Sequence, residues 1–268
     1  MSDTQLFSTM TFPEIYERVL VGPLFRPFAQ EVIARLEPTR SDSLIDIACG
    51  TGIVARLARE TLGPESRIAG VDVAPPMLAV ARSVDPTIDW REGTAMALPV
   101  TDSEKFSMLT CHQGLQFFPD RAAAVGEFRR ALAPGGRAAI ATWRSLQDIP
   151  VALELNEVAE RHVGTIVDSR HSLGDADTLK ALLVDGGFRE VSVETVSHDV
   201  SFADGALFAR LNAMAVIGMS EKGKGLSEAS RGAVAGQIAA DSQAVIDRCA
   251  KNGAFVFTLS TNIAVARA

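Results

Sequence analysis

The sequence predicts an α/β fold in which helices cover both faces of a largely parallel sheet. Three observations predict it. Short apolar runs rich in β-branched residues alternate with helical patterns between residues 43 and 143. A glycine-rich turn follows the first of these runs and opens a helix. An acidic residue, Asp72, ends the second run. Strands that alternate with helices in this way form parallel sheets with right-handed crossovers.

The N-terminal segment 12–37 has apolar side chains at helical spacing, with Pro13 at a first-turn position. Proline lacks an amide hydrogen and glycine is a weak helix former, so Gly22-Pro23 predicts a break in this helix. A second helix is expected over about 26–36, and it should end before Pro38.

The next hundred residues supply most of the predicted sheet. We expect strands at 43–48, 67–73, 87–92, 106–112 and 137–143. We expect helices at 52–61, 75–82 and 121–132, the last of them closed by the turn Pro134-Gly135-Gly136.

The C-terminal part continues the same alternation. We expect helices at 150–162 and 177–185, a long strand at 188–202, a mainly helical region at 204–252 with a loop at 220–225, and a last strand at 255–264.

The composition is that of an ordinary globular protein, with 47% hydrophobic and 22% charged residues among 268. A net charge of −7 argues against a nucleic-acid-binding surface. The three cysteines are widely spaced, so we expect buried thiols with neither a zinc site nor a disulfide framework. The polar start of the chain and the lack of long apolar runs predict a cytoplasmic protein without a membrane span. No acidic or histidine cluster has metal-ligand spacing, so no metal is expected.

The glycine turn carries the chemistry. Gly50, Gly52 and Ala55 match the pattern G-x-G-x-x-G/A, and Asp72 follows about 20 residues later, where it can take the two hydroxyls of a ribose. Asp46 lies four residues before Gly50. Its carboxylate would repel the pyrophosphate of NAD, which binds at a helix N-terminus. The same carboxylate favours S-adenosylmethionine (SAM), which carries an ammonium and a sulfonium and no phosphate.

These residues resemble the motifs of class I SAM-dependent methyltransferases, of the type that acts on small molecules. The similar segments stand in the family order and cover about residues 40 to 145. They are Asp46 to Gly52, Gly70 to Val73 with Met77-Leu78, Gly93 to Pro99, Cys111 to Asp120, and Leu132 to Arg137.

The resemblance implies a Rossmann-like sheet of seven strands whose last strand is antiparallel. It also implies one methyltransferase domain over 1–268, made of a helical N-terminal lid (1–39), a SAM-binding core (40–145) and a sheet-completing part (146–268). A helical cap inserted at about 203–253 would enclose the methyl acceptor together with the lid.

A set of cofactor contacts follows from the same resemblance. Asp46 would hold the ammonium of SAM and Asp72 its ribose, while the glycines would lie against its methionine part. Thr94 stands where many relatives carry an aspartate that accepts from the adenine amino group, and a neutral hydroxyl accepts less strongly. The implied cofactor-binding residues are Asp46, Ala48, Gly50, Gly52, Asp72, Val73, Met77, Thr94, Ala95, Cys111 and His112.

The acceptor is expected to be a small, partly apolar molecule, and the protein a monomer or homodimer. His112 ends the fourth predicted strand, so it is the candidate general base for an acceptor that enters protonated. It can equally be a residue that only lines the pocket. The candidate acceptor contacts are Tyr16, Gln113, Gln116, Phe117 and Trp143.

Two other functions stay open on the sequence. The chain can bind SAM without transferring its methyl group, as a regulator or as the catalyst of another reaction. It can also be a nicotinamide-dependent oxidoreductase that uses the same glycine turn, although Asp46 and the later motifs speak against this.

Overall fold

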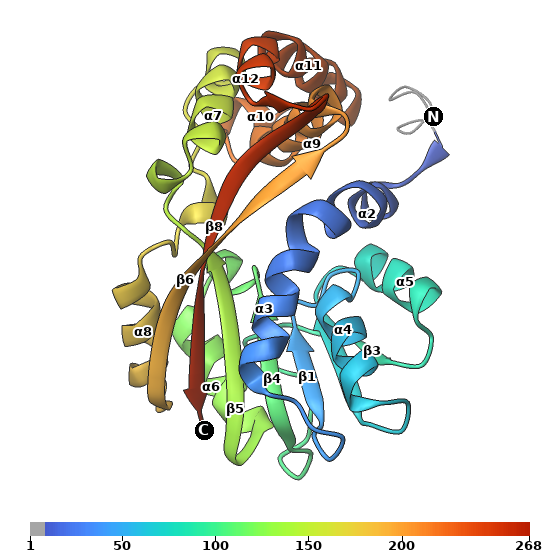
Figure 1. Ribbon diagram of the computed structural model, residues 1–268, viewed down its shortest axis with the longest axis vertical. Helices are drawn as coiled ribbons and strands as arrows, with labels where there is room; N and C mark the ends of the chain where they lie inside the picture. The colour runs from blue at the N-terminus through green and yellow to red at the C-terminus, as the bar shows by residue number, and fades with distance from the viewer. Residues whose placement is uncertain (1–8) are drawn as a thin grey trace. The chain divides into compact units, whose positions relative to one another are not determined.

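A computed structural model describes residues 9–268, so the polar first residues of the chain lie outside the described part. One sheet has the strand order β3-β2-β1-β4-β5-β8-β6 (Figure 1). Its strands are β1 (Leu44–Ile47), β2 (Ile68–Asp72), β3 (Asp89–Glu92), β4 (Phe106–His112), β5 (Leu132–Trp143), β6 (Arg189–Phe202) and β8 (Ala254–Arg267), and the short β7 (Ala250–Lys251) pairs with β8.

The strand directions agree with the predicted fold class. β1 to β5 pair in parallel, and β8 runs antiparallel to β5. The cross-strand hydrogen bond of Thr195 to Asn262 and that of Thr258 to Asp199 show that β6 also runs antiparallel to β8. The doubly wound sheet and its reversed last strand are therefore confirmed.

Alternate residues of the strands face two separate layers of helices (Figure 1). Leu44 and Met108 belong to a buried cluster with α3 (Arg26–Leu36), α4 (Ile53–Leu62) and α5 (Pro75–Val84). Their neighbours Ile45 and Leu109 belong to a second cluster with α6 (Arg121–Ala131) and α8 (Ala176–Asp185). A strand buried on both faces reads as a continuous apolar run, which is why these strands were visible in the sequence.

The described chain divides into two compact units. The first contains the residues up to 143 together with 173–196 and 261–268, and the second contains 144–172 and 197–260. The second unit is mostly helical. Its elements are η3 (Leu146–Asp148), α7 (Pro150–Val163), η4 (Ser169–His171), α9 (Gly205–Ile217), α10 (Glu221–Lys224), α11 (Glu228–Asp241) and α12 (Gln243–Arg248). Its core includes the packed rings of Phe202, Phe208, Phe255 and Phe257.

The predicted break at Gly22-Pro23 is wrong. The helix runs on through α2 (Phe12–Ile15), the π-helical stretch η1 (Tyr16–Phe25) and α3. Hydrogen bonds in a π-helix reach the fifth residue back, and the Arg26 N–H bonds to the Val21 carbonyl in this way. The wider turn accommodates Pro23, because the close contact that proline makes with the preceding α-helical turn is relieved.

Two smaller expectations also change. The loop expected at 220–225 contains α10, whose first turn is capped by the Ser220 hydroxyl accepting from the Gly223 N–H at 2.9 Å. β5 begins five residues earlier than expected, because the predicted Pro-Gly-Gly turn lies inside the strand as an irregularity in its pairing with β4. Gly135 takes a positive φ of 75° there.

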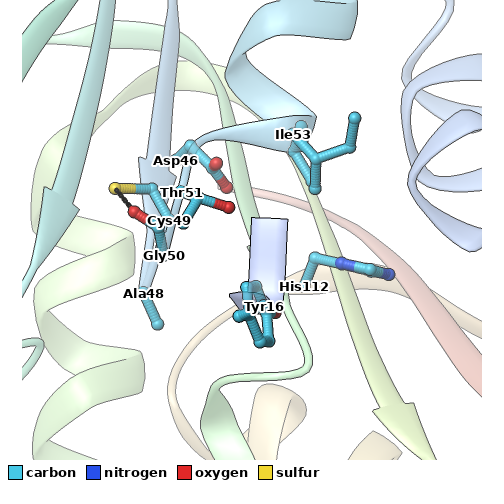
Figure 2. Close-up of a pocket in the computed structure, with 9 residues that line it drawn as sticks. Tyr16, Asp46, Ala48, Cys49, Gly50, Thr51, Ile53 and His112 are labelled. Carbon is cyan, nitrogen blue, oxygen red and sulfur yellow. Dashed lines mark hydrogen bonds between the residues drawn. The ribbon is translucent and has the colours of Figure 1, made fainter. Parts of the chain in front are cut away.

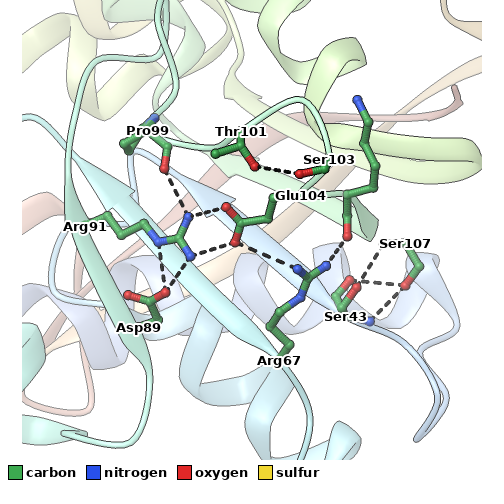
Figure 3. Close-up of polar contacts among 10 residues, drawn as sticks. Ser43, Arg67, Asp89, Arg91, Pro99, Thr101, Ser103, Glu104 and Ser107 are labelled. Atoms are coloured by element: carbon green, nitrogen blue, oxygen red, sulfur yellow. Dashed lines mark hydrogen bonds and ion pairs between the residues drawn. The ribbon is translucent and has the colours of Figure 1, made fainter.

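A polar network fixes the loop that follows β3 (Figure 3). Arg91 donates to both carboxylate oxygens of Glu104 at 2.9 and 2.7 Å and to the carbonyl of Pro99 at 3.0 Å. The hydrogen bonds from Arg91 lower the pKa of Glu104. Arg91 thus ties Pro99 and Glu104, two points of the loop that also contains Thr94 and Ala95, which are predicted to meet the adenine.

Trp90 of β3 fills the space beside two glycines of the motif region. A Cβ atom on Gly52 would lie 2.3 Å from the Trp90 ring, and one on Gly70 would lie 2.4 Å from it. The indole N–H donates to the Asp85 carbonyl at 2.8 Å, which fixes the ring. Both glycines therefore serve the packing of Trp90 beneath the turn.

We predict that Gly70→Ala lowers the free energy of unfolding by about 1–3 kcal/mol, because the new methyl group overpacks against the fixed Trp90 ring. Gly126→Ala is the matched control, since a Cβ there meets nothing within 4 Å inside α6. It should be neutral or stabilise by up to about 1 kcal/mol. Urea denaturation of both variants measures the difference, and equal stabilities would show that Trp90 does not constrain position 70.

Candidate functional site

The glycine turn connects β1 to α4 through three residues with positive φ: Ala48 at 55°, Gly50 at 56° and Gly52 at 92°. An L-residue is strained in this region, so Ala48 stores backbone strain of about 1 kcal/mol. A Cβ on Gly50 would meet nothing within 4 Å. The turn is therefore tightly wound and is open at Gly50, where a bound molecule can approach the backbone.

Asp72 ties the end of β2 to this turn. One of its carboxylate oxygens, Oδ2, accepts from the Gly50 N–H at 2.8 Å, and the other, Oδ1, accepts from the Ala74 N–H at 2.9 Å. Each carboxylate oxygen has two lone pairs, so each keeps one acceptor position. The side chain can therefore brace the turn and still accept from two further hydroxyl groups.

A pocket lies at the turn and brings together residues from the N-terminal helix, the turn and the end of β4 (Figure 2). Its lining consists of Tyr16, Asp46, Ala48, Cys49, Gly50, Thr51, Ile53, Val54 and His112. Three of these residues have a buried polar atom without a hydrogen-bond partner, namely Asp46 Oδ2, Thr51 Oγ1 and His112 Nε2. A buried polar atom without a partner costs about 1–3 kcal/mol, so the pocket is suited to a polar ligand.

Asp46 is the strongest of the three. It is 1% exposed, and its Oδ1 accepts from the Thr110 hydroxyl at 2.8 Å. Burial raises the pKa of Asp46 to about 7, although the hydrogen bonds from Thr110 and the backbone N–H of Ala55 oppose the shift. A buried carboxylate with one open oxygen is stabilised by a cation that donates to that oxygen.

His112 lies at the end of β4 and is 8% exposed. Burial lowers its pKa to about 3, so the imidazole is neutral over the physiological range. A general base works best with a pKa near the working pH, so this shift does not favour that role for His112. What the side chain offers is a hydrogen bond from a neutral ring whose Nε2 has no partner in the protein.

Tyr16 brings the N-terminal helix onto the pocket. Its ring lies 5.0 Å from that of Phe25, measured between centroids. Burial raises the pKa of Tyr16, and the negative charges of Asp72 and Glu17 add to the shift. Tyr16 is therefore an uncharged phenol at the pocket wall, at the place where a lid was expected.

The remaining predicted cofactor residues do not line this pocket. Val73 is 71% exposed at the end of β2. Thr94 directs its hydroxyl to the Met96 sulfur at 3.6 Å, and the side chains of Ala95 and Cys111 are buried in the cluster on the α6 face. Met77 lies in the first turn of α5. Their predicted contacts with SAM stay predictions.

The predicted acceptor residues other than Tyr16 also lie outside the pocket lining. Gln113 donates to the Thr261 hydroxyl at 2.9 Å, and Gln116 donates to the Gln113 carbonyl oxygen at 3.2 Å, so both amides belong to an internal network. Phe117 is 48% exposed in η2 (Leu115–Phe117). Trp143 is buried against the rings of Phe25 and Phe28.

Sequence reasoning did not single out Thr51, Ile53 or Trp90. Thr51 is a small polar residue between two glycines of the turn, and that position was a usable signal. Ile53 begins the helix after the turn and follows from the same motif. Trp90 had no signal in the sequence, because its effect comes from packing against two glycines on other elements.

Within residues 9–268, no group of three or more histidine, cysteine, aspartate or glutamate side chains is arranged to hold a metal ion. Over the same range, none of the helices combines the length and apolar character needed to cross a membrane. The three cysteines are free, and Cys49 and Cys111 are buried.

Comparisons with known proteins agree with the site. Residues 45–140 match the model of a methyltransferase domain. The 2-phytyl-1,4-naphthoquinone methyltransferase of Thermosynechococcus vestitus is 36% identical over 132 residues, which cover 47% of this chain and 58% of that protein. The chain spans about half the length of the curated relatives it matches.

Solved structures extend the likeness in fold to nearly the whole chain. Phosphoethanolamine N-methyltransferase 2 of Haemonchus contortus, solved with S-adenosylhomocysteine, has a TM-score of 0.59 at 18% identity over 98% of this chain and 58% of its own. The cyclase SpnF has a TM-score of 0.56 at 22% identity over 90% of this chain and 80% of its own.

The match at residues 45–140, the strand order and the glycine turn with its two acids agree on one assignment. Residues 45–140 of the chain therefore form a methyltransferase domain.

Proposed function

We propose that the chain is a SAM-dependent methyltransferase that acts on a small, partly apolar molecule. The observation that carries the proposal is the open oxygen of Asp46, buried in a pocket beside the glycine turn. A cationic ligand with a hydrogen-bond donor completes this group, and SAM has such a cation in its ammonium. The match to a methyltransferase domain supports the same ligand.

The residues at the turn fit SAM as follows. Asp46 accepts from the ammonium, and the Thr51 hydroxyl is a second polar partner for the methionine end. Asp72 keeps an acceptor position on each oxygen for the ribose hydroxyls while it braces Gly50. The open side of Gly50 leaves room for the ligand against the backbone.

SAM, when bound, supplies a methyl group on a sulfonium, and S-adenosylhomocysteine is the leaving group. The contribution of the protein is to align the acceptor with that methyl group and to exclude water, since alignment supplies much of the rate of a displacement. Tyr16 and His112 are the pocket residues on the side away from the turn (Figure 2). We therefore assign them to the acceptor side.

His112 is better suited to orient an acceptor than to remove its proton. A general base works best when its pKa lies near the working pH, and burial holds that of His112 at about 3. A neutral imidazole can still hydrogen-bond to an acceptor hydroxyl and direct its lone pair. The methylated product keeps that proton until it leaves the pocket and then releases it to bulk solvent.

A second candidate is a SAM-binding protein that catalyses a different reaction. A protein of similar fold is named a cyclase, so this architecture also occurs in a protein named for a reaction other than methyl transfer. That likeness is the reason to retain this candidate. A nicotinamide-dependent oxidoreductase is disfavoured, since the buried Asp46 beside the turn would oppose a pyrophosphate.

Incubation with SAM labelled on the methyl group tests the activity. Relatives named for naphthoquinones and menaquinones suggest aromatic acceptors for the panel, with phenols, amines and aliphatic alcohols beside them. We expect label to appear in an aromatic product together with S-adenosylhomocysteine. Tight SAM binding with no methyl transfer to any acceptor of the panel would favour the SAM-binding protein with a different reaction. Binding of NADH without binding of SAM would contradict both SAM-dependent candidates.

We predict that Asp46→Asn lowers SAM affinity by tenfold or more, because a charge-assisted hydrogen bond is worth about 1.5–3 kcal/mol. The same variant should be more stable without ligand at pH 8. The folded-state pKa is about 7 against an ordinary value of 3.8, so the contribution of Asp46 to stability is present below 3.8 and is lost as the pH rises to 7. Asparagine does not ionise, so the variant avoids this loss of folding free energy, which is about 4 kcal/mol at most.

Asp42→Asn is the matched control for that experiment. Burial acts to raise the pKa of Asp42, but hydrogen bonds from Thr39, Ser107 and Arg137 hold it below its ordinary value. Asp42→Asn should therefore destabilise the chain at pH 8 and leave SAM affinity unchanged. Thermal denaturation and calorimetric titration give both quantities. Unchanged SAM affinity in Asp46→Asn would remove Asp46 from the cofactor site.

We predict that Asp72→Asn also weakens SAM binding by about tenfold or more, since two ribose hydroxyls lose a charged acceptor. Asparagine keeps one oxygen for the Gly50 N–H, so the turn should survive. The comparison is Asp102→Asn, where the exposed carboxylate lies outside the site. Equal SAM affinities in the two variants would show that Asp72 only braces the turn.

A further inference from the structure

Tyr16 and His112 line the pocket, and the ring of Phe25 packs against both of them just outside its lining. The rings of Tyr16 and Phe25 lie 5.0 Å apart, and Phe25 meets His112 edge-on at 6.1 Å. Trp143 lies behind Phe25 at 6.0 Å. Phe25 is only half-buried, so part of the residue remains exposed beside the pocket-lining residues Tyr16 and His112.

The π winding of η1 explains how Tyr16 and Phe25 come to lie on the same side. They are nine positions apart, and an α-helix that advances about 100° per residue would put them on opposite sides of its axis. The wider π turn holds about 4.4 residues, so nine residues complete close to two full turns. The unusual winding therefore builds a continuous aromatic surface from residues that an ordinary helix would separate.

His112 adds a single polar point to this surface. Its Nε2 is buried, lines the pocket and has no hydrogen-bond partner in the protein. Buried polar atoms are normally paired, so this atom points to a polar group on the ligand. Of the three unpartnered polar atoms in the pocket, those of Asp46 in β1 and Thr51 in the turn are assigned to the cofactor, which leaves Nε2 of His112 for the acceptor.

We propose that Tyr16, Phe25 and His112 form an acceptor-recognition wall that selects a planar aromatic molecule bearing a hydroxyl group. The flat ring of the acceptor packs on Tyr16 and Phe25, and its hydroxyl hydrogen-bonds to Nε2 of His112. This inference rests on the proposed methyltransferase function and names the substrate class of the same site. Aromatic rings pack on one another at centroid distances of about 4.5–7 Å, which the wall already shows internally.

Three probes separate the parts of this proposal. They are 1-naphthol, which has a flat ring and a hydroxyl; 1-decalol, which has the hydroxyl on a saturated ring; and 1-methoxynaphthalene, which has the flat ring without a donor. Each is titrated calorimetrically into the full chain loaded with S-adenosylhomocysteine, whose own affinity is measured first. We expect 1-naphthol to bind about fivefold or more tightly than either other probe.

Variants of Phe25 and His112 test which side chain recognises the flat ring and which recognises the hydroxyl group. Phe25→Leu should weaken 1-naphthol about three- to tenfold, with little effect on 1-decalol. His112→Leu should remove the preference for 1-naphthol over 1-methoxynaphthalene. Phe12→Leu is the matched control, because Phe12 is an exposed ring near Tyr16 on the same N-terminal helical segment with no ring contact to His112. Phe25→Met, a flexible side chain of similar size, replaces Phe25→Leu if that variant does not fold.

The outcomes are distinguishable. Equal binding of the three probes by the wild-type chain, or equal effects of Phe25→Leu and Phe12→Leu, would overturn the recognition wall while S-adenosylhomocysteine binding upholds the cofactor site. A loss of S-adenosylhomocysteine affinity in Phe25→Leu without a change in probe selectivity would assign the ring to the cofactor instead. Failure of the wild-type chain to bind S-adenosylhomocysteine would end the proposed function and this inference with it.

Discussion

The site depends on a carboxylate that the fold buries and leaves half satisfied. Asp46 lies in β1 at the centre of the sheet, where one oxygen accepts from Thr110 of the neighbouring strand and the other has no partner. Burial makes this acid costly to ionise, so its pKa rises to about 7. A chain selected for stability alone would favour an uncharged residue here, since buried unpaired charges destabilise proteins. A cation that binds beside Asp46 offsets this cost, because it pairs with the buried carboxylate.

The rest of the turn keeps that carboxylate next to a ligand. Asp72 braces Gly50 from the end of β2, while Trp90 packs against Gly52 and Gly70 beneath the turn. These side chains come from the neighbouring strands β2 and β3, so the geometry of the turn is set by the sheet. Tyr16 of η1 lines the other side of the pocket and packs against Phe25. Rigid strands thus carry the part of the site that holds the cofactor, and a helix of unusual winding carries the part that we assign to the acceptor.

Much of the fold could be predicted from the sequence because its strands are buried on both faces. β4 lies at the predicted residues, 106–112, since a short run of mostly apolar side chains is typical of a strand buried on both faces. The last strand and its reversed direction came from the family resemblance and are confirmed. The Gly22-Pro23 break failed because the rule assumes α-helical winding, whereas the chain winds as a π-helix there.

The site was harder to predict wherever it depends on contacts between distant residues. The motif located Asp46, Gly50 and Asp72, but burial is a property of the folded chain, so the low pKa of His112 was not visible. Gln113 looked available to an acceptor, yet it is bonded to Thr261 from a strand 148 positions later. The pairing of Tyr16 with Phe25 was hidden for the same reason, because it needs the π winding between them.

Proton release on SAM binding tests the central claim most directly. Calorimetric titration with SAM at pH 6.5, in two buffers of different ionisation enthalpy, counts the protons exchanged. If the open oxygen of Asp46 receives the ammonium, the acid must ionise on binding, and an acid with a pKa of about 7 then releases most of one proton. The account predicts this release in the wild-type chain and its disappearance in Asp46→Asn. Binding of SAM to the wild-type chain without proton release would contradict it.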